Sequence, residues 1–167
     1  MSGSGDRRPS PLARLLGRST ERRALRWNLV ELCRRTAHEG WEHLQAAEAA
    51  GRGVALVVAA AGPWVIAARA LAAWAGPLHL APPAGAAERR LARRLCSAGR
   101  DRPRLAPDDD AAGRALAAGE KVLYVVAGQT ASGLAPPAIP AGVPILPLAV
   151  EHSSRGRYRL VVGKPGS

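Results

Sequence analysis

Three consecutive aspartates, Asp108, Asp109 and Asp110, are the side chains that most directly suggest a metal site. Adjacent carboxylates do not share a helix face, however, and these three lie just before an Ala- and Leu-rich stretch. Carboxylates at a helix start accept hydrogen bonds from free N–H groups and favour the positive end of the helix dipole. We therefore interpret the three aspartates as caps of a helix over residues 109–118, with a metal site as the alternative.

The histidines and serines show no spacing typical of a catalytic site. His38 and His43 are expected at the surface, and His152 beside Ser153 is expected in a turn. No serine lies in the Gly-x-Ser-x-Gly pattern that exposes a nucleophile on a strand-to-helix turn. Side-chain chemistry of the hydrolase type is therefore not indicated.

One segment could contribute to chemistry through its backbone. Residues 54–58 are an apolar run that predicts a buried strand, and small residues follow it. Pro63 suits the first position of a helix over residues 63–75, because no backbone N–H is needed there. The N–H groups at such a helix start can stabilise an oxyanion, and α/β proteins bind ligands beyond the carboxyl ends of their strands.

This segment resembles the first conserved block of the bacterial lipid A late acyltransferases, the lauroyl and myristoyl transferases of the lysophospholipid acyltransferase superfamily. That block reads Gly-Lys/Arg-Gly-Val, an apolar run, then His-Phe-Gly-Asn-Trp-Glu, and its His and Glu form the catalytic dyad. Ala60 stands at the His position and Val65 at the Glu position, and neither can take a proton. The residues that match the block are Gly51, Arg52, Gly53, Val54, Gly62 and Trp64.

The resemblance extends over residues 38–163. Ala81 replaces the Arg of a Tyr-Arg-Pro sequence, and His79 would share its face of a strand. Gly128 replaces the acid of an Asp-Gln pair, and the family's Phe-Phe-Gly motif is missing because the chain has no Phe. The further matching residues are Gly40, Glu42, Leu44, Pro82, Arg94, Gly99, Leu116, Gly119, Glu120, Gln129, Gly142, Pro144, Pro147, Gly156, Arg157, Tyr158 and Leu160.

The resemblance implies a reaction and a set of site residues. The reaction is acyl transfer to a lipid or glycolipid acceptor from an acyl carrier protein or coenzyme A thioester, without another cofactor or a metal. The changed dyad implies that activity is lost or greatly reduced. The alternative is a non-catalytic relative that binds lipid, an acyl carrier or a partner enzyme. The implied substrate-binding residues are Gly62, Trp64, Arg94 and Gln129.

Ala60 and Val65 belong to one strand-to-helix turn, so the resemblance also predicts a geometry. We expect both residues near one cleft, with Trp64 packed inward as its wall and Arg94 close by. The alternative is that the Ala-rich run only lets the helix pack closely on the sheet.

The elements that position this turn alternate along the chain, which predicts an α/β fold with a mostly parallel central sheet flanked by helices. The resemblance implies that this sheet is like the lysophospholipid acyltransferase core. We expect one domain over residues 19–167, after a flexible basic tail at residues 1–18. Strands are predicted at residues 54–58, 78–80, 121–126, 144–150 and 157–162. Helices are predicted from Ser19 or Thr20 to residue 35, and at residues 39–50, 63–75, 86–98 and 109–118.

The chain is strongly basic, with a formal net charge of +11. It lacks the motifs of nucleic-acid-binding modules, so the charge favours an anionic membrane surface or lipid as the partner. The Arg-rich helix before residue 35 either packs on the core with a solvated face or lies on anionic lipid. The basic helix over residues 86–98 is either solvated or contacts phosphate. Cys33 and Cys96 are expected as reduced, partly buried thiols.

No stretch of the sequence predicts a signal peptide or a transmembrane helix. The longest apolar run, residues 54–68, is broken by Gly62 and Pro63. We therefore expect a cytoplasmic protein or one held peripherally on the inner membrane.

Overall fold

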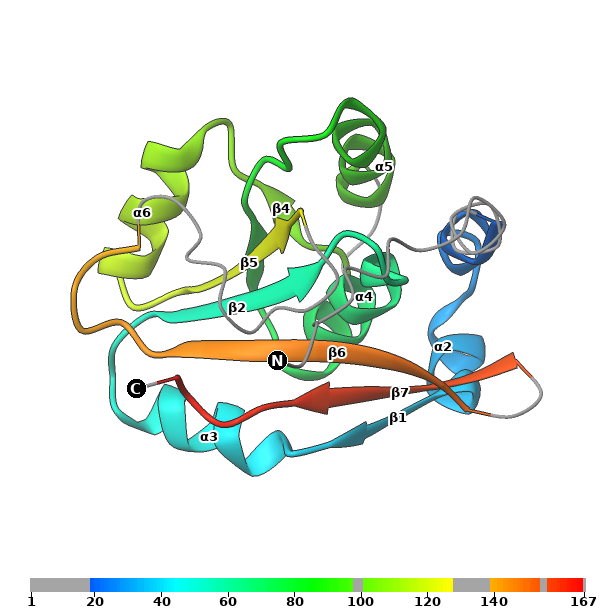
Figure 1. Cartoon of the computed structure of the whole chain (residues 1–167), viewed down its shortest axis with the longest axis horizontal. Helices are drawn as coiled ribbons and strands as arrows, with labels where there is room; N and C mark the ends of the chain where they lie inside the picture. Colours follow the sequence, from blue (N-terminus) through cyan, green and yellow to red (C-terminus); the bar gives the residue numbers. More distant parts are fainter. Residues whose placement is uncertain (1–18, 98–100, 128–138, 154–155, 167) are drawn as a thin grey trace, which may run out of the picture.

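A computed structural model describes residues 19–97, 101–127, 139–153 and 156–166 of the chain. Its centre is a seven-stranded sheet with the strand order β1-β7-β6-β2-β5-β3-β4 (Figure 1). All neighbouring strands are parallel except β6 and β7, which are antiparallel. The prediction of an α/β fold with a mostly parallel sheet flanked by helices is confirmed.

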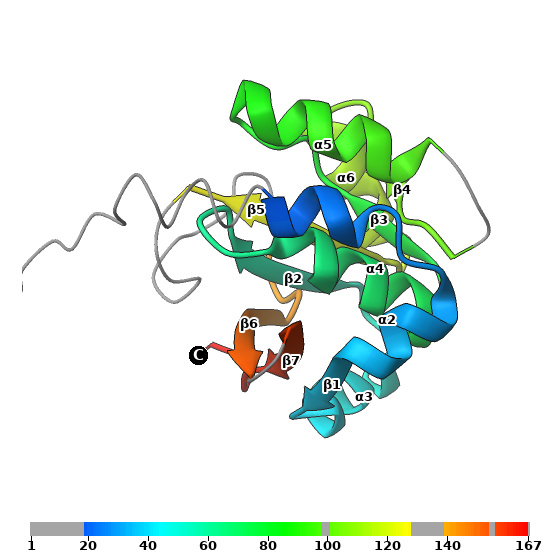
Figure 2. The same ribbon diagram turned by 90° about the vertical axis from the view of Figure 1, so that its right-hand side faces the viewer.

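Five strands have the positions that the sequence predicts, with β6 longer at its end. The strands are β1 Thr36–Glu39, β2 Val54–Ala59, β3 Leu78–Leu80, β4 Arg104–Leu105, β5 Lys121–Val126, β6 Ile145–Ser153 and β7 Arg157–Val162. The helices with defined bounds are α2 Leu29–Arg35, α3 Trp41–Ala49, α4 Trp64–Trp74, α5 Ala86–Cys96 and α6 Asp109–Ala117. Residues 19–24 are also helical and lie beside α4 and α5 (Figure 2).

β2 lies at the centre of the sheet, between β5 and β6, because its residues are apolar on both faces. Val54, Leu56 and Val58 belong to the apolar cluster that includes α4 and α5. Ala55 and Val57 belong to a second cluster with residues of α6. Successive side chains of a strand point to opposite faces, so this strand contributes to the core on both sides of the sheet.

Gly53 allows the start of β2 to pack closely against the end of α6. A Cβ atom at Gly53 would lie 2.2 Å from the carbonyl oxygen of Leu116, near the end of α6. Only glycine fits such a backbone approach. One of the residues that carry the family resemblance therefore has a packing role in this fold.

The prediction of one continuous helix up to residue 35 is wrong. The helix over residues 19–24 ends, and Asn28 caps a new helix, α2, by accepting a hydrogen bond from the N–H of Glu31 at 2.8 Å. Ser19 is already helical, so it does not cap the first helix. The Leu pattern predicted continuity, but Asn favours a cap over a helix interior.

Other differences from the predicted elements are small. Pro63 is the N-cap of α4, and the first helical residue is Trp64. The short strands β1 and β4 were not predicted. Cys33 is exposed, which corrects the expectation of a partly buried thiol, whereas Cys96 is half-buried.

Asp108 caps α6, as predicted. The side chain of Asp108 accepts a hydrogen bond from the N–H of Ala111 at 2.7 Å, and Asp109 and Asp110 lie in the first turn. Within the described ranges, every helix is too short or too polar to cross a bilayer.

Candidate functional site

The turn after β2 has the position that the sequence predicts. Ala60 follows the last residue of β2, and Val65 is the second residue of α4. The N–H groups of Ala60, Gly62 and Trp64 already donate to protein carbonyls, at 2.8, 3.2 and 2.9 Å. These three N–H groups are therefore engaged and do not form an oxyanion hole in this conformation.

A cavity of about 360 Å³ opens beside this turn. Its walls are the turn, one face of α5 and the helical segment at residues 19–24. The lining residues are Glu21, Arg22, Ala60, Ala61, Gly62, Ala87, Glu88, Arg90, Leu91 and Arg94. The structure thus brings Ala60, Gly62 and Arg94 together.

Of the predicted site residues that the structure describes, Trp64 and Val65 do not line this cavity. Val65 is fully buried in the apolar cluster, and Trp64 is 1% exposed in the same cluster. Trp64 therefore packs inward, whereas Val65 does not face the cavity that Ala60 faces. Gly128 and Gln129 lie outside the described residues.

Ala81, at the position of a family Arg, lies on the other side of the sheet from Ala60. Ala81 is buried in the cluster with α6, whereas Ala60 packs against the cluster with α4. His79 is half-buried and pairs with Glu120, its Nε2 lying 2.8 Å from Oε2. His79, Ala81 and Glu120 do not line the cavity after β2.

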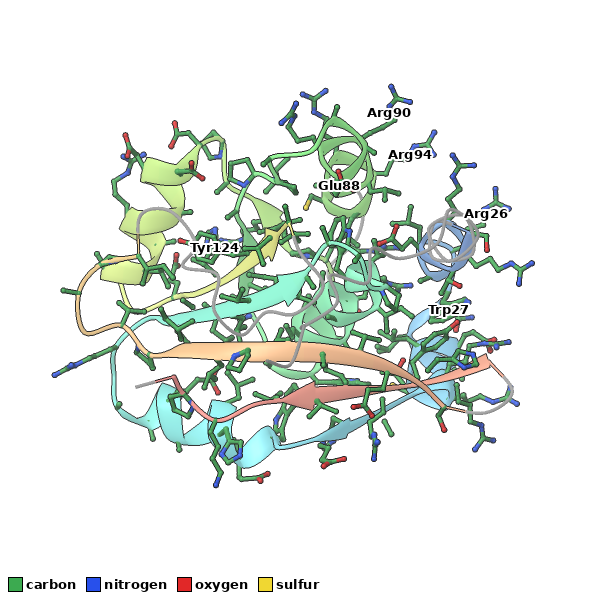
Figure 3. All side chains as sticks on the ribbon, in the orientation of Figure 1. Arg26, Trp27, Glu88, Arg90, Arg94 and Tyr124 are labelled. Carbon is green, nitrogen blue, oxygen red and sulfur yellow. The ribbon has the colours of Figure 1, made fainter. Side chains whose placement is uncertain are left out.

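The cavity combines positive charge with small walls. Arg22, Arg90 and Arg94 are exposed, and Arg90 and Arg94 are four residues apart on one face of α5 (Figure 3). Guanidinium groups bind phosphate and carboxylate oxygens with two parallel hydrogen bonds. Ala60, Ala61, Gly62 and Leu91 provide apolar or small surface beside them.

Two carboxylates balance part of this charge. Glu21 is 5% exposed at the cavity wall. Glu88 folds back over the start of α5, since a Cβ atom at Gly85 would collide with its carboxylate. Among the described lining residues, three arginines stand against two glutamates, so this part of the cavity carries a net positive charge and suits an anionic ligand.

The wall at residues 19–24 is held by two arginines from elsewhere in the chain. Arg69 of α4 donates to the carbonyl oxygens of Ala24 and Trp27, at 2.6 and 2.5 Å. Arg102 donates to the carbonyl oxygen of Leu25 at 3.0 Å. The carbonyl of Ala24 ends the helical segment and those of Leu25 and Trp27 follow it, so the guanidinium groups hold the C-terminal end of this segment.

Arg69 is 5% exposed, and its burial lowers its pKa to about 10. The nearby Arg102 lowers this pKa further, and Asp101 raises it. The guanidinium therefore remains charged at neutral pH. Sequence reasoning missed this residue, although one Arg within the apolar run of α4 is the signal that could have found it.

Tyr124 of β5 carries a polar atom on the α6 side of the sheet (Figure 3). Its hydroxyl is buried and has no hydrogen-bond partner within the described part of the chain. Burial raises the pKa of this hydroxyl, and the nearby Asp109 raises it further. The group is therefore neutral, and it lies on the face opposite to the cavity after β2.

Comparison of the chain with models of protein families finds no match, and comparison with curated proteins finds none either.

Proposed function

We propose that this protein is a non-catalytic relative of the bacterial lipid A late acyltransferases, and that it binds the acidic headgroup of a lipid in the cavity after β2. The observation that carries the proposal is the lining of this cavity. It places Ala60, at the family's His position, beside Arg22, Arg90 and Arg94, and among the described lining residues the groups that could accept a proton at neutral pH are the carboxylates of Glu21 and Glu88.

Three observations argue against acyl transfer at this site. The first is that Ala60 cannot act as the general base that takes the proton of the acceptor hydroxyl, and loss of this base alone costs about 10²–10⁴-fold in rate. Val65 is fully buried, so no acid at that position could orient a base at the cavity without rearrangement. The N–H groups of Ala60, Gly62 and Trp64 are already bonded.

Binding is supported because the cavity is open. A volume of about 360 Å³ falls within the usual range for small-molecule sites, at the low end of about 300–1,000 Å³. A phosphate would pair with Arg90 and Arg94, while Leu91 and the small residues of the turn accept the adjoining glycerol or the start of an acyl chain.

The position of the cavity also agrees with the proposed relationship. It lies beyond the carboxyl end of a central parallel strand, where open α/β sheets bind their ligands. We propose that this sheet corresponds to the lysophospholipid acyltransferase core and that the protein works at the cytoplasmic face of the inner membrane.

A second candidate is binding of an acyl carrier protein, and α5 favours it. Arg89, Arg90, Arg93 and Arg94 are all exposed on this one helix. A basic helix complements an acidic partner and raises the rate of their encounter. The same arginines would then contact the partner's surface rather than a headgroup.

An assay for acyl transfer and for bound lipid tests the proposal. The purified chain is incubated with an acyl carrier thioester and a lipid extract, and both the product and the lipid retained by the protein are measured by mass spectrometry. We expect no acylated product above the protein-free blank, together with retained lipid that carries a phosphate headgroup. Product formation would refute the non-catalytic assignment, and the absence of any retained lipid would refute the binding site.

A further inference from the structure

The helix α2 exposes apolar side chains that a folded protein usually buries. Among the residues that the structure describes, Leu29 and Val30 are the large hydrophobic residues with extensive exposure, at 45% and 66%. Leu32 of the same helix is 1% exposed and packs inward. Leu29 and Val30 therefore lie on the outward side of the helix, away from the core.

Arginines lie on α2 and on the segments next to it. Arg34 is exposed and lies four residues after Val30, so the two share the outer face of α2. A hollow of about 320 Å³ beside the helix is lined by Arg23, Arg26 and Arg35 together with Trp27. A neighbouring hollow of about 240 Å³ is lined by Glu31, Arg34, Arg35 and Arg157.

The acidic groups near this surface are already paired. Glu31 pairs with Arg35, which also donates to the carbonyl oxygen of Gly156 at 3.2 Å. Glu39 and Glu151 both pair with Arg159. Within the described ranges, no ion pair involves the four remaining arginines of this surface, Arg23, Arg26, Arg34 and Arg157.

We propose that this surface docks the protein on a lipid bilayer that carries anionic headgroups. The α2 face, as we name it, consists of Arg23, Arg26, Leu29, Val30, Arg34 and Arg157. Leu29 and Val30 enter the boundary between headgroups and acyl chains, and the arginines contact lipid phosphates. None of these residues lines the cavity after β2, so the inference goes beyond the proposed function.

Charge and exposure together select a bilayer over other partners. A second copy of the chain would bring two sets of unpaired arginines against each other, which is repulsive. A nucleic acid would attract the arginines but would gain nothing from two exposed aliphatic side chains. An anionic bilayer satisfies both kinds of group at once.

Vesicle co-sedimentation of the full chain tests the docking. The vesicles consist of phosphatidylcholine alone or of phosphatidylcholine with phosphatidylglycerol, at low and at high salt. We expect binding to the anionic vesicles, weakened by salt, and little binding to the neutral ones. Equal binding to both kinds of vesicle, or no binding to the anionic ones, would overturn the proposal.

Variants assign the binding to the α2 face. The double variant Leu29→Ser with Val30→Ser should weaken vesicle binding about tenfold. The double variant Arg26→Gln with Arg34→Gln should weaken it about tenfold or more, since each basic residue near the surface contributes about fivefold. The four positions are exposed, so the variants should unfold at the wild-type temperature, which circular dichroism checks.

The matched control removes the same charge elsewhere. Helix α6 and the chain after β7 lie on the other side of the molecule from α2 (Figure 1). Arg114 on α6 and Lys164 after β7 are both exposed. The double variant Arg114→Gln with Lys164→Gln should bind vesicles within about twofold of wild type, because charge distant from the bilayer is screened. An equal loss in this control would overturn the assignment, as would a concentration-dependent dimer that the two serine substitutions disperse. Retained lipid in the cavity should be unchanged in these serine variants, which separates this test from that of the proposed function.

Discussion

Ala60 and Arg94 line one cavity, although Ala60 lies in the turn after β2 and Arg94 lies on α5. Val65 is only five positions after Ala60 but is fully buried in the apolar core on the same side of the sheet. The two positions at which the family resemblance expects a catalytic pair therefore have different environments.

Restoring the pair should not restore a site. We expect Ala60→His to be tolerated, because Ala60 borders the cavity. Val65→Glu should lower the free energy of unfolding by about 3 kcal/mol or more, because it buries a carboxylate without a partner. Urea unfolding measures the free energy of unfolding of these two single variants. The control is Ala61→Glu, which places a carboxylate at an exposed position of the same turn.

The destabilisation by Val65→Glu should depend on pH in a known direction. Burial raises the pKa of the introduced carboxyl above its unfolded value of about 4.3, so the loss of stability grows as pH rises above that value and shrinks below it. We expect no acyl transfer by the Ala60→His, Val65→Glu double variant. A loss of stability independent of pH, or an active double variant, would show that Val65 reaches the cavity after all.

Arg69 should hold the N-terminal wall of the cavity. Replacing it with Met removes its hydrogen bonds to the carbonyl oxygens of Ala24 and Trp27. We expect the free energy of unfolding to fall by about 3 kcal/mol, because hydrogen bonds to a buried charged group are stronger than neutral ones. Arg26→Met, at an exposed position nearby, should change it by less than about 0.5 kcal/mol.

Hydrogen exchange gives a second measure of the Arg69 variant. Exchange at residues 19–24 should accelerate more than exchange in β2 and β5, because the wall loses the hydrogen bonds that Arg69 donates at its C-terminal end. A stability equal to wild type would mean that these hydrogen bonds do not hold the wall.

The sequence predicted the strands whose side chains are buried. β2 and β5 have apolar residues on both faces, and such runs indicate buried strands without any tertiary information. β1 was missed because it reads Thr-Ala-His-Glu with only Thr36 buried, and β4 because it has two residues. Short strands at a sheet edge carry no hydrophobic pattern.

The candidate site was predictable only where it follows from the order of strands and helices. Ala60 and Gly62 follow a central strand, and that order alone placed them at the carboxyl edge of the sheet. Glu21 and Arg22 line the cavity because the helix that carries them ends before α2 begins. Hydrogen bonds from Arg69 and Arg102 stabilise this break. Contacts between distant segments of this kind have no local signature in the sequence.

Cys96 should react slowly with alkylating reagents. Burial raises the pKa of its thiol from 9.0 to about 11, although Arg102 acts in the opposite direction. Because the thiolate is the reactive form, this shift lowers reactivity at pH 8 by about a hundredfold relative to an ordinary thiol. The rate of reaction with iodoacetamide, measured on a Cys33→Ser variant, should keep rising with pH between 9 and 11.

The same shift has a consequence for stability. Between pH 9 and 11 the native state holds the Cys96 proton more than the unfolded state does, so this group lowers the free energy of unfolding as pH rises. A Cys96→Ala variant should lose this contribution to the pH dependence. A rate of alkylation that levels off near pH 9 would contradict the burial of this thiol.

We propose that the cavity after β2 binds an acidic headgroup, and this binding can be measured by calorimetric titration with a short-chain, water-soluble phosphatidic acid. The Arg90→Gln, Arg94→Gln double variant removes two guanidinium groups from the cavity. The matched control, Arg93→Gln with Arg114→Gln, removes the same charge from exposed positions of α5 and α6 that do not line the cavity. We expect the cavity variant to weaken binding at least about tenfold, while the control stays within about threefold of wild type. Equal losses in the two variants, or no binding by the wild-type chain, would contradict the proposal.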